Sequence, residues 1–130
     1  MKKTILTIMF SITSCILFGQ ARNGNSAADI SAEFSERIYD LKSGLTKDGD
    51  YYILIKTERA SVLYNFDSDK VCTTTVIVPE NDGALNFYVE MYNKQYVIIS
   101  PTSWKMYSSQ GILDIELVYP EGGGTYFIWK

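Results

Sequence analysis

The clearest hydrophobic pattern in the chain begins near residue 28 and has helical spacing. Five large apolar side chains recur three or four positions apart, which places them on one face of an α-helix. Ser26 or Asp29 can cap the start of this helix, and Gly44 is a suitable terminator. The pattern predicts a helix over residues 28–44, and its apolar face is formed by Ile30, Phe34, Ile38, Leu41 and Leu45.

After a turn at residues 47–50 the pattern changes from helical to extended. Three runs rich in Tyr, Ile, Val and Thr follow, and short polar breaks separate them. Such runs are typical of antiparallel strands joined by tight connections. The predicted strands cover residues 51–57, 60–66 and 71–78.

The second half of the chain follows a similar order. Residues 84–93 predict a second, largely apolar helix, with Asp82 as its cap. Extended runs bounded by Pro and Gly turns then predict further strands. These strands cover residues 96–99, 103–107, 112–119 and 125–129.

The resulting order, α-β-β-β-α-β-β-β(β), predicts an α+β fold. Runs of antiparallel strands with few helices favour helices packed on one face of a sheet. We therefore expect two helices on a mainly antiparallel sheet of about six or seven strands.

The N-terminal residues have the three-part layout of a secretory signal peptide. Lys2 and Lys3 precede residues 4–18, in which ten of fifteen side chains are apolar, and small or polar residues follow. A membrane span needs roughly 20 apolar residues, so this run is short for a permanent anchor. We expect cleavage after Ala21 or just before Gln20, and export to the periplasm or the extracellular space. The predicted organisation is a signal peptide at 1–21, a short polar leader at 22–26 and a single α+β domain at 27–130.

A lipid anchor at Cys15 is the alternative interpretation of the N-terminus. Residues 12–15 resemble a relaxed bacterial lipobox, and cleavage before Cys15 would leave an acylated cysteine at the membrane. The apolar residues 16–18 argue against this alternative, because lipoproteins usually begin with a polar tether. Membrane attachment is expected only if Cys15 is lipidated.

Composition excludes several classes of function. The chain has no histidine, which excludes Ser-His-Asp and Cys-His catalysis and every His-ligated metal site within one chain. Removal of residues 1–21 leaves ten basic and fifteen acidic residues, a net charge of −5. A nucleic-acid partner is therefore not expected, because such binding needs a basic face. Cys72 is the single cysteine left, so an internal disulfide is excluded.

Two polar features could indicate a reactive thiol or a metal site, and neither matches the full pattern that such a site requires. Cys72 has only Lys70 near it in sequence to activate it, which favours a buried thiol over a nucleophile or an intermolecular disulfide. Asn65, Asp67 and Asp69 alternate as at the start of a calcium loop, but Lys70 stands where that loop needs glycine. We predict no catalytic residue, no metal and no cofactor. A small hydrolase using carboxylates is the enzymatic alternative.

Aromatic content is the feature that points toward binding. Fourteen of the sixteen aromatic residues after residue 21 lie beyond residue 50. Tyr and Trp supply large contact areas at low entropic cost. Between residues 101 and 111, Trp104 and Met106 alternate with Lys105 and Tyr107, as in a strand that either meets a partner or covers a small core. The predicted binding residues are Trp104, Lys105 and Tyr107, and the partner is another protein or a glycan.

These features together predict an exported, non-catalytic binding module of the bacterial envelope or the extracellular space. The alternatives are a lipid-anchored envelope component acylated at Cys15 and a small hydrolase using carboxylates.

Overall fold

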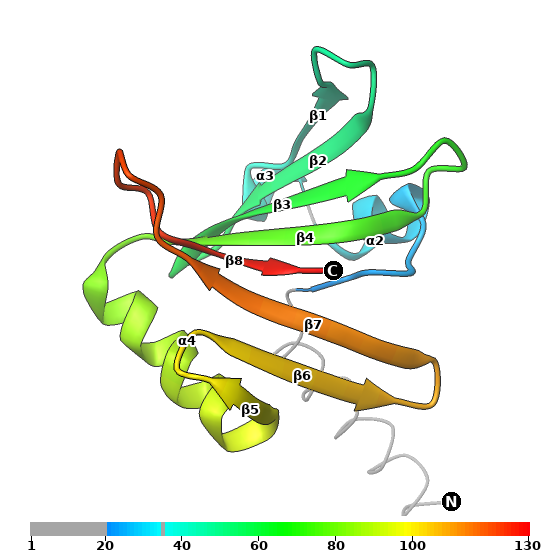
Figure 1. The fold of residues 1–130 in the computed structure, drawn as a ribbon. Coiled ribbons are helices and arrows are strands. Elements are labelled where there is room, and N and C mark those ends of the chain that lie inside the picture. The colour runs from blue at the N-terminus through cyan, green and yellow to red at the C-terminus, as the bar shows by residue number, and fades with distance from the viewer. Residues whose placement is uncertain (1–20, 35) are drawn as a thin grey trace, which may run out of the picture.

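The computed structural model describes residues 21–34 and 36–130, which form an eight-stranded antiparallel sheet with helices on one of its faces (Figure 1). The predicted α+β class with an antiparallel sheet is confirmed. The helices are α2 (Ala27–Glu33), α3 (Glu36–Tyr39) and α4 (Asp82–Gln95). The strands are β1 (Lys42–Leu45), β2 (Tyr51–Lys56), β3 (Ala60–Phe66), β4 (Cys72–Pro79), β5 (Val97–Ser100), β6 (Ser103–Ser108), β7 (Gly111–Val118) and β8 (Tyr126–Trp129).

The sheet consists of two four-stranded meanders joined side by side. Its strand order is β1-β2-β3-β4-β8-β7-β6-β5, so the last strands of the two meanders, β4 and β8, pair in the centre. Figure 1 shows this order from β1 at the top of the twisted sheet to β5 at the bottom. The first strand of each meander, β1 or β5, is therefore an edge of the sheet.

The core lies on the face of the sheet that the helices cover. Residues paired across neighbouring strands point to the same face, so the register connects buried side chains into rows. One row crosses the six central strands, and each member is at most 2% exposed: Ile53, Tyr64, Thr75, Trp129, Ile115 and Trp104. A parallel row consists of Ile55, Val62, Ile77, Phe127 and Leu117.

Each half of the covered face is packed by its own helix. In the first half, Phe34 follows α2 and stacks on Tyr64 with a centroid separation of 6.0 Å. In the second half, Tyr92 of α4 lies 5.0 Å from the ring of Phe127 and 5.6 Å from the ring of Trp129. Burial of these rings fixes both helices on the same side of the sheet.

Helix α4 lies where the sequence predicted it, but its cap is different. The side chain of Asn81 accepts a hydrogen bond from the backbone N–H of Ala84 at 2.8 Å, so Asn81 is the N-cap. Asp82, the predicted cap, is instead the first residue of the helix. Its acidic side chain suits that position because the first turn of a helix favours negative charge.

The prediction of one helix over residues 28–44 is wrong at its C-terminal end. Helix α2 ends at Glu33, its C-cap Phe34 is already extended, and α3 is a single turn. Ile38, expected on the buried face, is 75% exposed. The chain then turns at Asp40, where φ is +47°. A left-handed residue cannot continue an α-helix.

The remainder of that predicted helix is strand β1. It pairs with β2, with Lys42 opposite Leu54 and Leu45 opposite Tyr51. Gly44, expected as a helix terminator, lies inside this strand, where a Cβ atom would be 3.1 Å from the Tyr52 hydroxyl oxygen. The additional strand makes the sheet eight-stranded, so the expected six or seven strands and the α-β-β-β order of the first half are corrected.

Residues 22–26, expected as a polar leader, are hydrogen-bonded to the sheet. The backbone N–H of Gly24 donates to the Cys72 carbonyl at 2.7 Å, and the N–H of Cys72 donates to the Asn25 carbonyl at 2.8 Å. Arg22 forms a salt bridge with Glu33 of α2. Apart from Ala21, the predicted signal peptide, including Cys15, lies outside the described residues.

None of the helices in the described part of the chain combines the length and the apolar character that crossing a membrane requires.

Candidate functional site

Of the three predicted binding residues, Trp104 is in the core. Its side chain is 1% exposed and lies under α4, where its indole N–H donates to the Asn93 Oδ1 at 2.8 Å. Its ring meets that of Tyr92 edge-on at 5.6 Å. The expectation that Trp104 contributes to an exposed aromatic ribbon is therefore wrong, and its large ring serves packing.

Lys105 and Tyr107 point to the opposite side of the sheet. They alternate with Trp104 along β6, and successive residues of a strand face opposite sides. The Lys105 ammonium lies 3.4 Å from a carboxylate oxygen of Asp114. Tyr107 is 58% exposed and pairs with Ile112, which is 56% exposed. The structure separates these two residues from Trp104 and places them on the uncovered side, and binding through them stays a prediction.

The uncovered side of the sheet, here called the open face, carries apolar residues as well as polar ones. The registers of four neighbouring central strands align one aliphatic row on it. Its members are half-buried: Leu54, Leu63, Val76 and Ile128. Val78 of β4, two residues beyond Val76 on the same face, is exposed. The described helices pack on the other face, and none of them covers this row.

Ion pairs border the aliphatic row on one side. Glu116 of β7 is the cross-strand partner of Ile128, and its carboxylate lies 3.0 Å from the ammonium of Lys130. Lys105 and Asp114 form the second pair on β6 and β7. All four charged side chains are substantially exposed, and such pairs are worth only about 0–1 kcal/mol each to stability. The open face thus has an aliphatic row at its centre with paired charges along one side.

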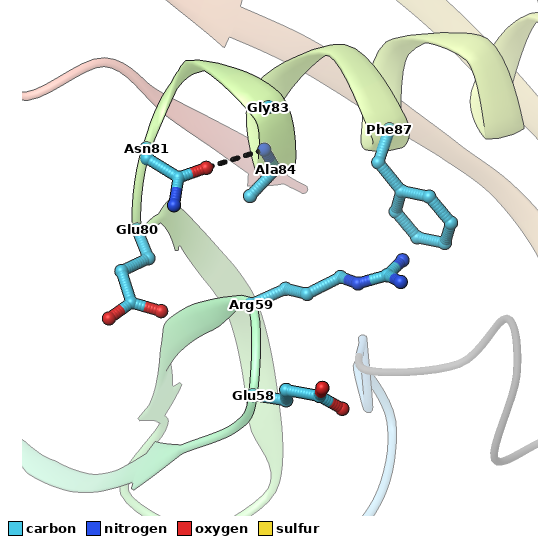
Figure 2. Close-up of a pocket in the computed structure, with 7 residues that line it drawn as sticks. All are labelled: Glu58, Arg59, Glu80, Asn81, Gly83, Ala84 and Phe87. Carbon is cyan, nitrogen blue, oxygen red and sulfur yellow. Dashed lines mark hydrogen bonds between the residues drawn. The ribbon is translucent and has the colours of Figure 1, made fainter.

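A pocket of about 380 Å³ lies where the β2–β3 turn approaches the start of α4 (Figure 2). The guanidinium carbon of Arg59 lies 3.8 Å from the centroid of the Phe87 ring, as Figure 2 shows. Glu58 and Glu80 add two carboxylates to the lining, and Asn81 is occupied as the cap of α4. The cation–π contact connects the turn to the helix, which gives Arg59 a packing role.

The thiol of Cys72 is buried, which confirms the expected packing role. Cys72 is 2% exposed, and its Sγ lies 3.5 Å from the Thr74 carbonyl oxygen and 3.8 Å from the Thr75 hydroxyl. Burial raises the pKa of the Cys72 thiol, and these hydrogen bonds only partly oppose the increase. A raised pKa disfavours the thiolate that a nucleophile requires.

The turn at residues 67–71 is held by its own aspartate. One carboxylate oxygen of Asp67 accepts hydrogen bonds from the backbone N–H groups of Asp69 and Val71, at 2.9 and 3.0 Å. This carboxylate therefore stabilises the hairpin, as short polar turn residues commonly do. Within residues 21–34 and 36–130, no group of three or more acidic or cysteine side chains is arranged to hold a metal ion.

Three tyrosines have a perturbed pKa, and all belong to or border the core. Burial raises the pKa of Tyr64 and Tyr92 far above the usual value, and it also raises the pKa of Tyr96. For Tyr92, the hydrogen bond accepted from the Trp129 indole N–H at 3.2 Å opposes this effect without cancelling it. Burial therefore favours the neutral form of these hydroxyls.

Comparisons with protein-family models, with curated proteins and with solved structures find no match for this chain. The open face was missed by sequence reasoning, although a signal was present. In β2 and β3, apolar residues occupy positions of both parities, as in Ile53-Leu54-Ile55 and Val62-Leu63-Tyr64. A strand with one wetted face normally alternates apolar and polar residues, so these runs indicated apolar side chains on both faces.

Proposed function

We propose that this protein is an exported, non-catalytic module that binds another protein through the open face of its sheet. The observation that carries the proposal is the aliphatic row Leu54, Leu63, Val76 and Ile128, which crosses four central strands on the side opposite the helices. Contiguous apolar surface with a polar border is characteristic of interaction sites.

The chemistry of the open face favours a protein over a glycan. A glycan site would use exposed aromatic rings as stacking platforms, whereas the centre of this face is aliphatic. Tyr107 of β6 is exposed, and Tyr52 and Tyr126 are half-buried on the same face, but all three lie outside the aliphatic row. The matching partner surface is apolar at its centre, with charged groups at its rim facing the Lys105–Asp114 and Lys130–Glu116 pairs.

The titratable groups support binding rather than hydrolysis. Glycoside hydrolysis needs a carboxyl group with a raised pKa beside a second carboxylate. On the open face, Asp114 and Glu116 are each paired with a lysine ammonium rather than with a second carboxylate. Among the described residues, the groups with a raised pKa are Cys72 and tyrosines in or beside the core.

Export is tested by the mass of the N-terminal peptide of the protein isolated from cells that express it. We expect a chain that starts at Gln20 or Arg22. A diacylglyceryl group on Cys15 would show that the protein is the lipid-anchored alternative and not a soluble module. A soluble cytoplasmic chain that retains Met1 would contradict export.

Binding is tested by photo-crosslinking in the same cells. A benzophenone side chain is introduced at Leu63 or Ile128 on the open face, and at Phe87 on α4 as a matched exposed control. We expect adducts of one common mass from the first two positions and none of that mass from Phe87. Absence of such an adduct from both open-face positions would contradict the proposal.

The protein identified in the adduct is then purified and titrated by calorimetry. Leu63→Lys, which places a charge in the aliphatic row, should abolish binding, while Asn86→Lys, which adds the same charge at an exposed position of α4, should leave it unchanged. Retained secondary structure and a cooperative melt show that each variant is folded. Binding lost only in Tyr107→Ala, or competed by free sugars, would favour the glycan alternative over the aliphatic row.

A further inference from the structure

The two edges of the sheet differ sharply in chemistry. At β1, the edge carries Lys42, paired with Asp40 at 3.8 Å, and Gly44. At β5, the edge is Val97-Ile98-Ile99-Ser100, without a charge. Charged side chains are the usual means by which an edge strand is protected from pairing with another chain. The β5 edge lacks this protection.

The apolar side chains of β5 are exposed on both sides of the strand. Val97, Ile98 and Ile99 are 49%, 55% and 53% exposed. Successive side chains of a strand point to opposite faces, so a bound partner covers them only if it lies along the edge itself. The inner side of β5 pairs with β6, with Val97 opposite Lys105 and Ile98 opposite Trp104, and the register shifts between Ile98 and Ser100. A partner that pairs with the outer backbone groups of β5 must be an extended strand. To cover the exposed side chains as well, that strand must be apolar on both faces.

We propose that this strand is β5 of a second copy of the same chain, paired antiparallel about a two-fold axis to make one continuous sheet. A second β5 is extended, uncharged and apolar on both faces, so it meets both requirements, and a two-fold contact closes after two copies. Lys105, the charged residue on the neighbouring strand, is already paired with Asp114, so the contact buries no unpaired charge at that position. The edge is separate from the open face, and this inference does not rest on the proposed function.

The symmetry restricts the register of the contact. In an antiparallel pair, directly opposite residues alternate between hydrogen-bonded and non-hydrogen-bonded pairs. A two-fold axis must map each pair onto a pair of the same type. The axis therefore passes midway between one residue and the same residue of the second copy, which lie directly opposite each other. Near the middle of β5 that residue is Ile98, or Ile99, where the pairing of β5 with β6 shifts register. Directly opposite residues have Cα atoms about 4.5–5.5 Å apart, within the range that a disulfide bridges.

The association is tested by sedimentation of the protein isolated from cells that express it, over a range of concentrations. We expect the weight-average mass to approach twice that of the monomer as concentration rises. Ile98→Lys and Ile99→Lys should keep it at the monomer mass. Leu45→Lys, at the opposite edge on a residue that is 68% exposed, is the matched control and should dimerise as the unmodified protein does.

Cysteine crosslinking tests the register in a Cys72→Ala background. Under mild oxidation, Ile98→Cys or Ile99→Cys should give a disulfide-linked dimer, while Leu45→Cys should not. A protein that stays monomeric at all concentrations overturns the proposal. So does a dimer that both lysine variants leave intact, or one in which neither β5 cysteine crosslinks. Circular dichroism of every variant confirms that loss of association is not loss of folding.

Discussion

Thr75 shows how one hydroxyl can hold the N-terminal segment to the sheet. Among the described residues, Thr75 is the only polar residue that is buried in the core. Its hydroxyl donates to Asn23 Oδ1 at 2.7 Å and accepts from the Arg22 backbone N–H at 3.2 Å. The Asn23 amide in turn donates to the carbonyls of Thr73 and Trp129, at 2.9 and 3.0 Å. These bonds attach residues 22–23 to the two central strands, β4 and β8.

We predict that Thr75→Val lowers the free energy of unfolding by about 1–3 kcal/mol, because it keeps the side-chain shape but removes the hydrogen-bond partner of Asn23. Urea unfolding measures this loss. Thr74→Val, at the adjacent position on the open face, is the control and should change stability by only about 0.5 kcal/mol. Equal losses in the two variants would show that the hydroxyl of Thr75 has no special role.

The buried tyrosines predict a loss of stability in alkali. Burial raises the folded-state pKa of Tyr64, Tyr92 and Tyr96 above the unfolded value of about 10. Above that pH the unfolded chain releases protons that the folded chain retains, so the stabilisation present below pH 10 is lost as pH rises toward the folded pKa. Each tyrosine contributes a slope of at most about 1.4 kcal/mol per pH unit.

Urea unfolding at a series of pH values between about 8 and 11 measures this slope. Tyr96→Phe removes one titrating hydroxyl and should make the decline shallower. An unchanged slope in this variant would show that Tyr96 ionises equally in the folded and unfolded chains.

At the scale of elements, the pattern of apolar and polar residues predicted the strands correctly where their positions depend on nearby sequence. The strands after residue 50 lie within about two residues of their predicted positions, because β-branched and aromatic runs between turn residues leave few alternatives. The helix predicted over residues 28–44 failed because Leu45 fits helical spacing while the backbone of residues 42–45 pairs with β2. That pairing is a tertiary contact, which overrides a weak local preference.

The same limit applies to the candidate site. Alternation along β6 correctly separates Trp104 and Met106 from Lys105 and Tyr107. It does not tell which set lies under α4, because that depends on where a helix distant in sequence packs. The apolar side chains of the open face could be anticipated from runs such as Ile53-Leu54-Ile55, whereas the exposed edge at β5 depends on strand order.

Trp104 and Tyr107, three residues apart in β6, should respond very differently to truncation. Trp104→Ala removes a buried ring and the donor to Asn93, so we expect a loss of about 3–5 kcal/mol in the free energy of unfolding. Tyr107→Ala removes an exposed ring and should cost about 0.5 kcal/mol. Thermal and urea unfolding measure both values. A small loss in Trp104→Ala would mean that this ring is not part of the core.

At the scale of the whole molecule, the two meanders share one sheet and one buried row. The row that begins at Ile53 in β2 continues without a break through Thr75 and Trp129 to Trp104 in β6. Separation of the meanders between β4 and β8 would expose this row and break the hydrogen bonds from Asn23. The cost of that exposure opposes independent unfolding of either half.

We therefore predict that the two halves unfold in one transition. Cys72 in β4 reports on the first meander, because its buried thiol reacts with a labelling reagent only after opening. Trp104 and Trp129 report on the second meander through their fluorescence. Both signals, followed through the same urea series, should have the same midpoint, as a two-state transition requires. If the tryptophan signal changed at a lower urea concentration than thiol labelling, the β5–β8 half would open first, and the pairing of β4 with β8 would be too weak to couple the meanders.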